Sequence, residues 1–590
     1  MRKKYFFHKE KSHFYQPGEE IRVNRKNQLE ERDSLNSVKS RVVLAAVAFC
    51  CVYLVLVLRL FDLCVLKARE NSAVYNYSQD EEFKHILKYT EMPIMRADIL
   101  DRNGTIIATS LPTVHLYANP SKIRHKVELA HKLAKIIPDV SYESFLKKLE
   151  MKARFVYLKR NLTPSQQYQI NALGNPWLEF EKSEKRIYPH KNLFAHIIGA
   201  TNIDNDGVSG LEKQLNSRLT ESDIPLQLTI DSGLQDTIRE ELLQAVEKFH
   251  AEGASAILMD VRNGEILAML SLPDYDPNSN NNISERAQFN FTTKGVYEPG
   301  SVLKIFNAAL GLESGKVKVT DKFDATQPLK LRYNVIKDYR GENRWLDLPE
   351  IMIHSSNIGS ARIALKVGKD EQRRFLESLG FFAPVKSIEV AEKGIPLIPS
   401  YKNWGESTVA TVGYGYGISI TPLHLISAFA SVVNGGMYYE PTLVKNNKNT
   451  TSHRTLSYNT SMQMRQLLRG VVVKGSGKRA NVAGYEVAGK TGTANKPVNG
   501  HYVDKKVYTS FLATFPVSDP KYALYLMLDE PKPIKETWGF VTSGWNTVPT
   551  AGKIITAIAP QLDLPANNDI YESRHERIIN ADYTVRKNNK

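Results

Sequence analysis

The stretch Tyr297-Glu298-Pro299-Gly300-Ser301-Val302-Leu303-Lys304 decides how this chain is organised. Pro299-Gly300 is a turn signal, and the run that follows, 305–312 (IFNAALGL), is apolar nearly all round, which predicts a helix buried inside a domain. Ser301 would stand at the mouth of that helix, and Lys304, one turn further on the same face, could reach its hydroxyl. A lysine accepts a proton from serine only if burial or a second cation lowers its pKa. The stretch therefore predicts a nucleophile beside a base.

Two later motifs strengthen this hypothesis. A Ser-x-x-Lys pair alone is weak evidence, because Ser144 to Lys147 and Ser518 to Lys521 match it as well. Ser355-Ser356-Asn357 follows the first motif, and Lys490-Thr491-Gly492-Thr493 comes later, where Lys-Thr-Gly occurs once in the chain. Penicillin-binding proteins and class A β-lactamases carry such a set in this order.

Composition describes ordinary globular material with one exception near the N-terminus. The chain has 590 residues, 42% of them hydrophobic and 24% charged, which is enough for two to four domains. Residues 42–58 carry no charge, and the mostly apolar stretch continues to 66, long enough to cross a bilayer. It starts 41 residues into the chain and no small-residue cleavage site follows it. We therefore expect an uncleaved anchor rather than a signal peptide.

Charge predicts the orientation of this anchor. Residues 1–41 carry eleven Lys and Arg against six Asp and Glu, and an excess of Lys and Arg marks the cytoplasmic side. The remainder of the chain would then lie outside the cytoplasm. The net charge of +15 is spread thinly and shows no interleaving of basic and aromatic residues, so we expect no binding to nucleic acid.

Cysteine and histidine usage predicts no metal and no cofactor. All three cysteines lie in or beside the apolar segment, which leaves none for a disulfide or for thiol chemistry in the exported part: Cys50, Cys51 and Cys64. The histidines from the start of the second motif to the strands of the third show no metal-ligand spacing: His354, His424, His453 and His501.

Periodicity and turn residues predict two exported domains. In the first, a hairpin turns at Arg102-Asn103-Gly104 within 96–108, residues 126–172 look helical, and a turn-rich segment at 186–212 closes the domain. A boundary falls near Ile224-Pro225. The second domain is predicted to contain a strand at 226–230, a helix at 232–250 capped by Asp231 or Ser232, a hairpin of 254–260 and 265–270, strands at 508–515 and 522–528 beside the Lys490 motif, and a helix at 548–559.

On these residues the chain resembles the class B penicillin-binding proteins, and among them the FtsI-type septal peptidoglycan D,D-transpeptidases. The resemblance rests on Tyr-Glu-Pro-Gly-Ser at 297–301, Ser-Ser-Asn at 355–357 and Gly-Glu-Ile-Leu-Ala-Met at 264–269. The segment Gly-Trp-Asn-Thr-Val-Pro-Thr-Ala-Gly at 544–552 is similar to the form in α-proteobacterial division enzymes. Elongation-type relatives carry Pro-Pro-Gly-Ser and an Asp in the second motif, and neither is present here.

The resemblance implies an α/β fold of the α+β type. It has a single N-terminal transmembrane helix, an elongated non-catalytic pedestal domain, and a serine β-lactamase-like transpeptidase domain whose antiparallel sheet is flanked by helices. The implied boundaries are a cytoplasmic tail at 1–41, the anchor at 42–66, a pedestal or dimerisation-like domain at 67–225, the transpeptidase domain at 226–565, and a flexible tail at 566–590.

The resemblance also implies residue roles. Ser301 would attack the penultimate D-Ala of a stem peptide, Lys304 would take its proton, Ser355 would relay a proton to the leaving amine, Asn357 would hold the peptide amide, and Lys490 would press the Lys304 pKa downward. Thr491 and Thr493 share one face of a strand, suited to a terminal carboxylate, and Gly492 would leave room for the substrate backbone to add as a strand. The N–H groups of Ser301 and Thr493 would form the oxyanion hole.

Partners and alternatives follow from the same resemblance. Peptidoglycan stem peptides would be the substrate, β-lactams covalent inhibitors, and an FtsW-like glycosyltransferase with other division proteins the partners at the inner membrane. The alternatives are an elongation-type transpeptidase, a D,D-carboxypeptidase, and a β-lactam sensor or scaffold. A β-lactamase needs a deacylating water. The one Glu-x-x-Leu-Asn string, 212–216, precedes the nucleophile and is interpreted as a chance match.

Overall fold

The computed structural model describes residues 47, 50–58, 95–279, 282–332, 334–446, 451–498 and 501–566. The chain divides into two units, Met1–Pro93 and Ile94–Lys590. In the first unit residues 47 and 50–58 are helical and exposed, and the remaining parts of the predicted anchor and tail lie outside the described residues, as does the C-terminal tail from 567. Among the described helices, none combines the length and the apolar character that a bilayer crossing requires.

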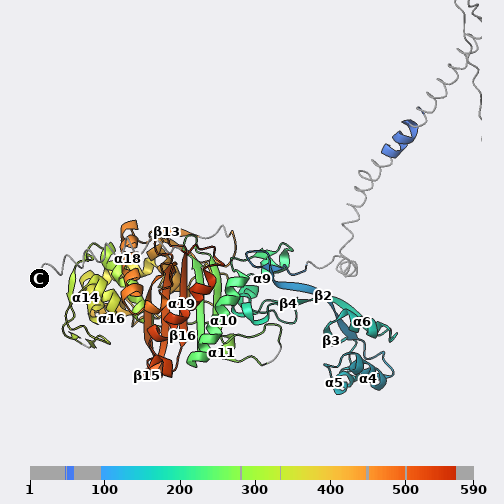
Figure 1. Ribbon diagram of the computed structural model, residues 1–590. Coiled ribbons are helices and arrows are strands. Elements are labelled where there is room, and N and C mark those ends of the chain that lie inside the picture. The colour runs from blue at the N-terminus through green and yellow to red at the C-terminus, as the bar shows by residue number, and fades with distance from the viewer. Residues whose placement is uncertain are drawn as a thin grey trace, which may run out of the picture. The chain divides into compact units, whose positions relative to one another are not determined.

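A five-stranded antiparallel sheet forms the centre of the larger unit (Figure 1). Its strand order is β14-β15-β16-β6-β7, which confirms the antiparallel sheet predicted from the sequence and leaves β14 at an edge. The register places Thr491 of β14 opposite Phe511 of β15. The strands are β6 (Gly253–Asp260), β7 (Ile266–Leu272), β14 (Ala488–Val498), β15 (His501–Phe515) and β16 (Tyr522–Asp529).

Helices cover both faces of this sheet, because the strands alternate their apolar side chains between two cores. Ile257 and Met259 of β6 face the core that contains α17 (Pro422–Val433), whereas Ala256 and Leu258 face α10 and α19. Helix α10 (Ser232–Phe249) is capped by Asp231, whose carboxylate accepts the N–H groups of Gly233 and Leu234. This confirms one of the two caps predicted from the sequence. Helix α19 spans Thr547–Ile558.

The first motif and its surroundings form a helical layer beside the sheet. Its helices are η4 (Gly300–Leu303), α12 (Lys304–Glu313), α13 (Leu348–His354), α14 (Asn357–Val367), α15 (Lys369–Ser378), α16 (Glu406–Tyr414) and α18 (Tyr458–Lys474). Short elements complete the domain: α11 (Glu285–Gln288), β8 (Lys322–Asp324), β9 (Leu329–Leu331), β10 (Asn334–Ile336), β11 (Trp345–Asp347), β12 (Met437–Tyr439), β13 (Ser452–Arg454), η5 (Lys478–Ala480), η6 (Lys535–Thr537) and η7 (Ser543–Trp545).

The N-terminal part of the larger unit contains a second sheet. Strand β2 pairs with β1, β3 and β4, and β1 pairs in parallel with β5. The predicted hairpin is confirmed, since Ile99 faces Ala108 across β1 and β2. Its elements are β1 (Ile99–Leu100), β2 (Ile106–Ala118), β3 (Val156–Leu162), β4 (Leu178–Ile187), β5 (Leu226–Gln227), α4 (Lys126–Ile136), α5 (Tyr142–Glu150), α6 (Pro164–Asn171), η3 (Lys191–Phe194), α7 (Ala195–Ile198), α8 (Gly210–Gln214) and α9 (Asn216–Glu221).

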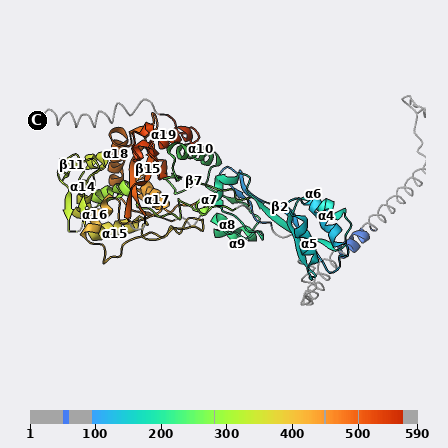
Figure 2. The ribbon, with the colours of Figure 1, turned by 90° about the horizontal axis from the view of Figure 1, so that it is seen from below.

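One prediction for this region was wrong. Residues 126–172 are not helical throughout, because 156–162 form strand β3 between α5 and α6. Pairing with the distant strand β2 decides this: Leu158 and Leu162 of β3 are buried in the core that α4 and α5 also line. Figure 2 shows α4, α5 and α6 grouped at this sheet.

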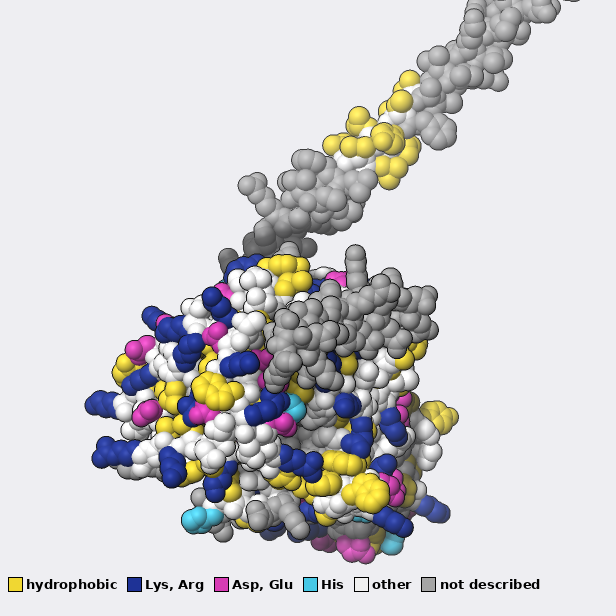
Figure 3. Space-filling model, turned by 60° about the vertical axis from the view of Figure 1, so that its left-hand side comes forward, with side chains coloured by type: hydrophobic (Ala, Val, Ile, Leu, Met, Phe, Trp, Pro, Cys, Tyr) yellow, Lys and Arg dark blue, Asp and Glu magenta, His cyan; other side chains and the backbone are white. Residues whose placement is uncertain are grey.

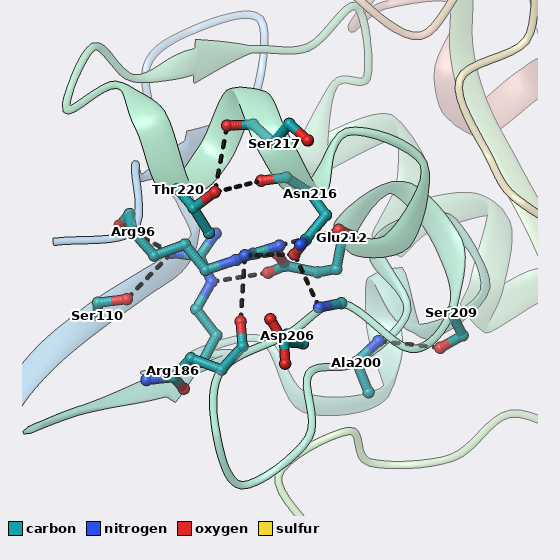
Figure 4. A network of polar contacts seen from close by, with 12 residues as sticks. Arg96, Ser110, Arg186, Ala200, Asp206, Ser209, Glu212, Asn216, Ser217 and Thr220 are labelled. Carbon is teal, nitrogen blue, oxygen red and sulfur yellow. Dashed lines mark hydrogen bonds and ion pairs between the residues drawn. The ribbon is translucent and has the colours of Figure 1, made fainter. Parts of the chain in front are cut away.

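A buried charged network ties the ends of the second sheet to α8 (Figure 4). Glu212 is fully buried and accepts from Arg96 Nε at 2.6 Å and from Arg186 Nε at 2.7 Å. Asn216 accepts from Arg96 Nη1 at 2.8 Å. Buried charges are tolerated when they are paired and hydrogen-bonded. Glu212 and Asn216 therefore stabilise this sheet by accepting hydrogen bonds from the two arginines. The network accounts for the string at 212–216 without any hydrolytic role.

Candidate active site

The nucleophile turn is held against the edge strand by backbone geometry. Gly300 has φ 57°, and a Cβ placed on it would lie 2.9 Å from the Thr493 carbonyl oxygen, so a side chain is excluded there. Its N–H donates to the carbonyl of Gly415 at 3.0 Å. Ser301 follows in η4, directly before α12, and is half-buried. The position predicted for Ser301 at the mouth of a core helix is confirmed.

Two lysines from different motifs converge on one serine of the second motif. Lys304 Nζ lies 3.1 Å from Ser355 Oγ and also donates to the Ser355 carbonyl at 2.5 Å and to Asn357 Oδ1 at 2.7 Å. Lys490 Nζ lies 2.9 Å from the same Ser355 Oγ. Ser301 Oγ itself makes no hydrogen bond with a described residue. The three motifs therefore meet in space, with Ser355 at the centre and the Ser301 hydroxyl free for a ligand.

Burial sets the charge of both amines. Lys304 and Lys490 are 1% and 0% exposed. Burial, and then the neighbouring Lys490 charge, hold the pKa of Lys304 well below its usual value, while Asp338 opposes this shift. Burial alone lowers the pKa of Lys490 to about 7. Two ammonium groups sharing one buried hydroxyl repel each other, which favours the neutral form of Lys304.

The second motif adopts a backbone conformation that its sequence does not predict. Ser355 ends α13 in the left-handed region at φ 57°, which is uncommon for a residue with a side chain, and Ser356 caps α14. Such a conformation persists when neighbouring groups hold it. The tight bend points the Ser355 hydroxyl at the lysines and Asn357 at Lys304.

Asp338 supplies that support, and the sequence analysis missed it. Its carboxylate accepts from Ser356 Oγ at 2.7 Å and from the N–H groups of Asn357 at 2.5 Å and Ile358 at 3.0 Å. The neighbouring Lys337 carbonyl accepts from Asn357 Nδ2 at 2.9 Å. Asp338 lies in a loop without periodicity, and no spacing rule links it to the motif. The one hint in the sequence was that Asp338 has a carboxylate, which can accept hydrogen bonds from the N–H groups at a helix N-terminus.

The third motif occupies the free edge of the sheet. Thr491 Oγ1 lies 2.7 Å from Ser476 Oγ, and Thr493 Oγ1 accepts from the N–H of Ser543 at 3.2 Å. Ser476 and Ser543 were not singled out from the sequence, because each is a single serine in a turn. The outer edge of β14 carries no strand partner among the described residues, so its backbone groups can pair with an extended ligand.

Gly492 has a structural reason in addition to the role predicted from the sequence. A Cβ there would meet Ser510 Oγ at 2.4 Å, Val302 Cγ2 at 2.8 Å and the Pro299 carbonyl at 3.1 Å. Those atoms belong to the protein, so the glycine makes room for the nucleophile turn to pack on β14. The expectation that Gly492 also leaves space for the substrate backbone stays a prediction.

Comparisons with known proteins agree with this fold. The description "Penicillin binding protein transpeptidase domain" matches residues 254–544, and "Penicillin-binding Protein dimerisation domain" matches residues 91–224. A probable peptidoglycan D,D-transpeptidase FtsI of Caulobacter vibrioides is 35% identical over 490 residues, covering 80% of this chain and 82% of that protein. A probable peptidoglycan D,D-transpeptidase PenA of Neisseria meningitidis is 30% identical, covering 78% and 84%.

Solved structures show the same architecture at lower identity. Penicillin binding protein 3 of Mycobacterium tuberculosis, complexed with aztreonam, has a TM-score of 0.63 and 22% identity over 80% of this chain and 98% of that one. A peptidoglycan synthetase of Bifidobacterium adolescentis has a TM-score of 0.64 and 20% identity, covering 80% and 96%. Fold and motifs define a serine penicillin-binding transpeptidase domain joined to a dimerisation domain. The chain belongs to the penicillin-binding protein family, and FtsI and PenA are among its similar relatives.

Proposed function

We propose that this protein is a peptidoglycan D,D-transpeptidase with Ser301 as its nucleophile. The observation that carries the proposal is the convergence of the buried amines of Lys304 and Lys490 on Ser355 Oγ, at 3.1 and 2.9 Å, beside the turn that presents Ser301. A buried amine with a lowered pKa is the base that a serine hydroxyl needs. Membership of the penicillin-binding protein family supports the substrate class.

In the first half-reaction the Ser301 oxygen attacks the carbonyl carbon of the penultimate D-Ala, and its proton passes to neutral Lys304. A neutral amine has two N–H donors and one lone pair. The Ser355 carbonyl at 2.5 Å and Asn357 Oδ1 at 2.7 Å take both donors, so the Ser355 hydroxyl at 3.1 Å faces the lone pair, which gives up this contact when it accepts the Ser301 proton. The bond to the terminal D-Ala nitrogen then breaks, and the Ser355 hydroxyl relays the proton that Lys304 accepted to that leaving amine, which returns Lys304 to its neutral form.

In the second half-reaction an amine of a neighbouring stem attacks the acyl-enzyme carbonyl and loses a proton to neutral Lys304. The ester bond to Ser301 then breaks, and that proton returns to the Ser301 oxygen, which completes the cross-link. The N–H groups of Ser301 and Thr493 would stabilise the oxyanion in both halves, and Gly300 packs against Thr493 at the place where these groups must meet. Loss of one such donor costs about 2.7–4 kcal/mol in kcat. Thr491 and Thr493 would bind the terminal carboxylate, and the donor peptide would extend the sheet along the free edge of β14.

Labelling with fluorescent penicillin tests the nucleophile. Wild-type protein should retain the label on Ser301 through denaturation, Ser301→Ala should not label, and its unchanged melting temperature would show that the variant is folded. Rapid release of hydrolysed drug from wild type would indicate a β-lactamase and would contradict the proposal.

Product analysis separates the remaining activities. A transpeptidase forms cross-linked dimer from stem peptides, whereas a D,D-carboxypeptidase releases D-Ala without dimer. A sensor or scaffold would bind penicillin and form neither product. Dimer that depends on Ser301 is the expected result.

We further propose a septal role at the inner membrane. The expected arrangement is a cytoplasmic N-terminus, a single anchor at 42–66 and a periplasmic catalytic domain, with an FtsW-like glycosyltransferase and other division proteins as partners. The similarity to an FtsI of Caulobacter vibrioides supports division over elongation. A fluorescent fusion at the division site is expected, and a signal along the lateral wall would favour the elongation-type alternative.

A further inference from the structure

A hollow in the N-terminal part of the larger unit contains none of the residues of the three motifs. It has a volume of about 770 Å³, within the range of binding sites for drug-sized ligands. Two loops, 121–125 and 173–177, and the first two turns of α4 surround it. Its lining residues are Ser121, Lys122, Ile123, Arg124, His125, Glu128, Leu129, Lys132, Leu173, Gly174, Asn175, Pro176 and Trp177.

The hollow combines an apolar floor with an exposed aromatic wall. Ile123 and Leu129 are buried beneath it. Trp177 stands at its side with 38% of its surface exposed, and the Lys122 amine lies 5.6 Å from the centre of the indole ring. An indole ring left exposed beside a cation offers a flat apolar face for stacking, which is why tryptophan is enriched in binding sites.

The charges that line the hollow are predominantly positive, and two of the basic side chains form no ion pair with a described residue. Lys132 is paired with Glu128 at 2.7 Å, and that glutamate is the single acidic residue of the lining. Lys122 and Arg124 are exposed and form no ion pair with a described residue. On the face of the molecule in Figure 3, by contrast, basic side chains are interspersed with acidic, apolar and uncharged ones. The hollow therefore favours an anionic ligand that also has an apolar face.

We propose that this hollow is an accessory binding site for the peptidoglycan strand, resting on the proposed transpeptidase function. A glycan strand with stem peptides presents both required features: sugar rings whose faces stack on an indole, and peptide carboxylates that pair with Lys122 and Arg124. The substrate is a polymer, so a second contact on the same strand raises the effective concentration of its stem peptides at the catalytic cleft. A weak site is sufficient for this effect.

The test uses the full-length protein in detergent with Ser301 first acylated by penicillin, so that the catalytic cleft is blocked in every arm. Binding to purified peptidoglycan sacculi is measured by co-sedimentation. The affinity of the variant Lys122→Glu/Arg124→Glu for sacculi should fall by about tenfold or more, because two attractive charges become repulsive. The conservative variant Lys122→Arg/Arg124→Lys should bind as wild type. Trp177→Ala should weaken binding, whereas Trp177→Phe should retain most of it.

The matched control is Lys135→Glu/Lys147→Glu, which changes net charge equally at two exposed lysines of α4 and α5 outside the hollow. It should bind as wild type. Equal losses in both double variants would mean diffuse attraction to a basic lobe and would overturn the proposal. Retained binding of Lys122→Glu/Arg124→Glu to sacculi would also overturn the proposal. So would a wild-type protein that binds phosphatidylglycerol vesicles, or an acidic protein, but not sacculi.

A kinetic readout connects the site to catalysis. In unblocked enzyme, Lys122→Glu/Arg124→Glu should raise KM for polymeric strands and leave both kcat and penicillin labelling unchanged. KM for a short stem peptide, which cannot reach both sites, should not move. If Ser301 fails to label with penicillin, the proposed function fails, and sedimentation with sacculi still reports on the hollow independently.

Discussion

Removing the Asp338 carboxylate should slow acylation without unfolding the protein. Asp338→Ala deletes the acceptor of two backbone N–H groups and of the Ser356 hydroxyl, which together hold the second motif in its left-handed bend. Asp338 is half-buried, so water replaces part of each bond, and we assign about 1 kcal/mol to each of them. The loss of about 2–3 kcal/mol of local order predicts acylation slower by about 30- to 150-fold.

The assay is the second-order rate of penicillin acylation, followed by stopped-flow fluorescence across pH. Asp338→Asn keeps an oxygen for the backbone N–H groups and should lose less than Asp338→Ala. Both variants also remove a negative charge that favours protonated Lys304, so the pKa of Lys304 falls further. The acidic limb of the rate profile should therefore move to lower pH. A purely structural role of Asp338 would not shift that limb. Among the described residues, Lys490 is the other charged group that acts on the pKa of Lys304.

The matched control for this prediction is Asp324→Ala. Asp324 also accepts from a backbone N–H, that of Thr326, at 3.0 Å, but makes no contact with the three motifs. It should acylate at the wild-type rate. Equal rates for Asp338→Ala and Asp324→Ala, with no movement of the acidic limb, would refute the positioning role of Asp338.

Three further predictions concern charge and packing. Burial lowers the pKa of Lys490 from 10.5 to about 7, so between these pH values the unfolded chain binds more protons than the folded chain. The melting temperature of the wild type should therefore rise as the pH is raised from about 7 to 10.5. In Lys490→Met the same change of pH should raise the melting temperature less. Glu212→Gln should leave two buried guanidinium groups uncompensated and lower the unfolding free energy by about 3–5 kcal/mol in urea titrations, while the folded fraction still labels with penicillin. Gly492→Ala should lower the free energy of unfolding by about 1–3 kcal/mol and slow acylation, because its methyl group displaces Val302 beside the nucleophile. In the control Gly405→Ala the methyl group meets open space, so neither the free energy of unfolding nor penicillin labelling should change.

Local patterns were sufficient for the elements that carry the three motifs. The apolar run after Ser301 and the strand-like segments 254–260 and 265–270 predicted a core helix and a hairpin, and both are present as α12 and as β6 with β7. Strand β3 was missed because its seven residues satisfy a helical pattern as well as a strand pattern, and distant pairing with β2 resolved the ambiguity. The domain boundaries and the roles of the site residues stay predictions.

The sequence by itself determined which groups are available: one Lys-Thr-Gly, a Ser-x-x-Lys after a turn, and a Ser-Ser-Asn between them. Tertiary structure alone decided that Ser355, rather than Ser301, is the hydroxyl on which both lysines converge, that Asp338 holds it there, and that Gly492 serves the nucleophile turn. The physical reason is that spacing along a helix or strand determines neighbours within one element. Hydrogen bonds between elements, and the burial that shifts the pKa of an amine, depend on how segments far apart in the chain pack together.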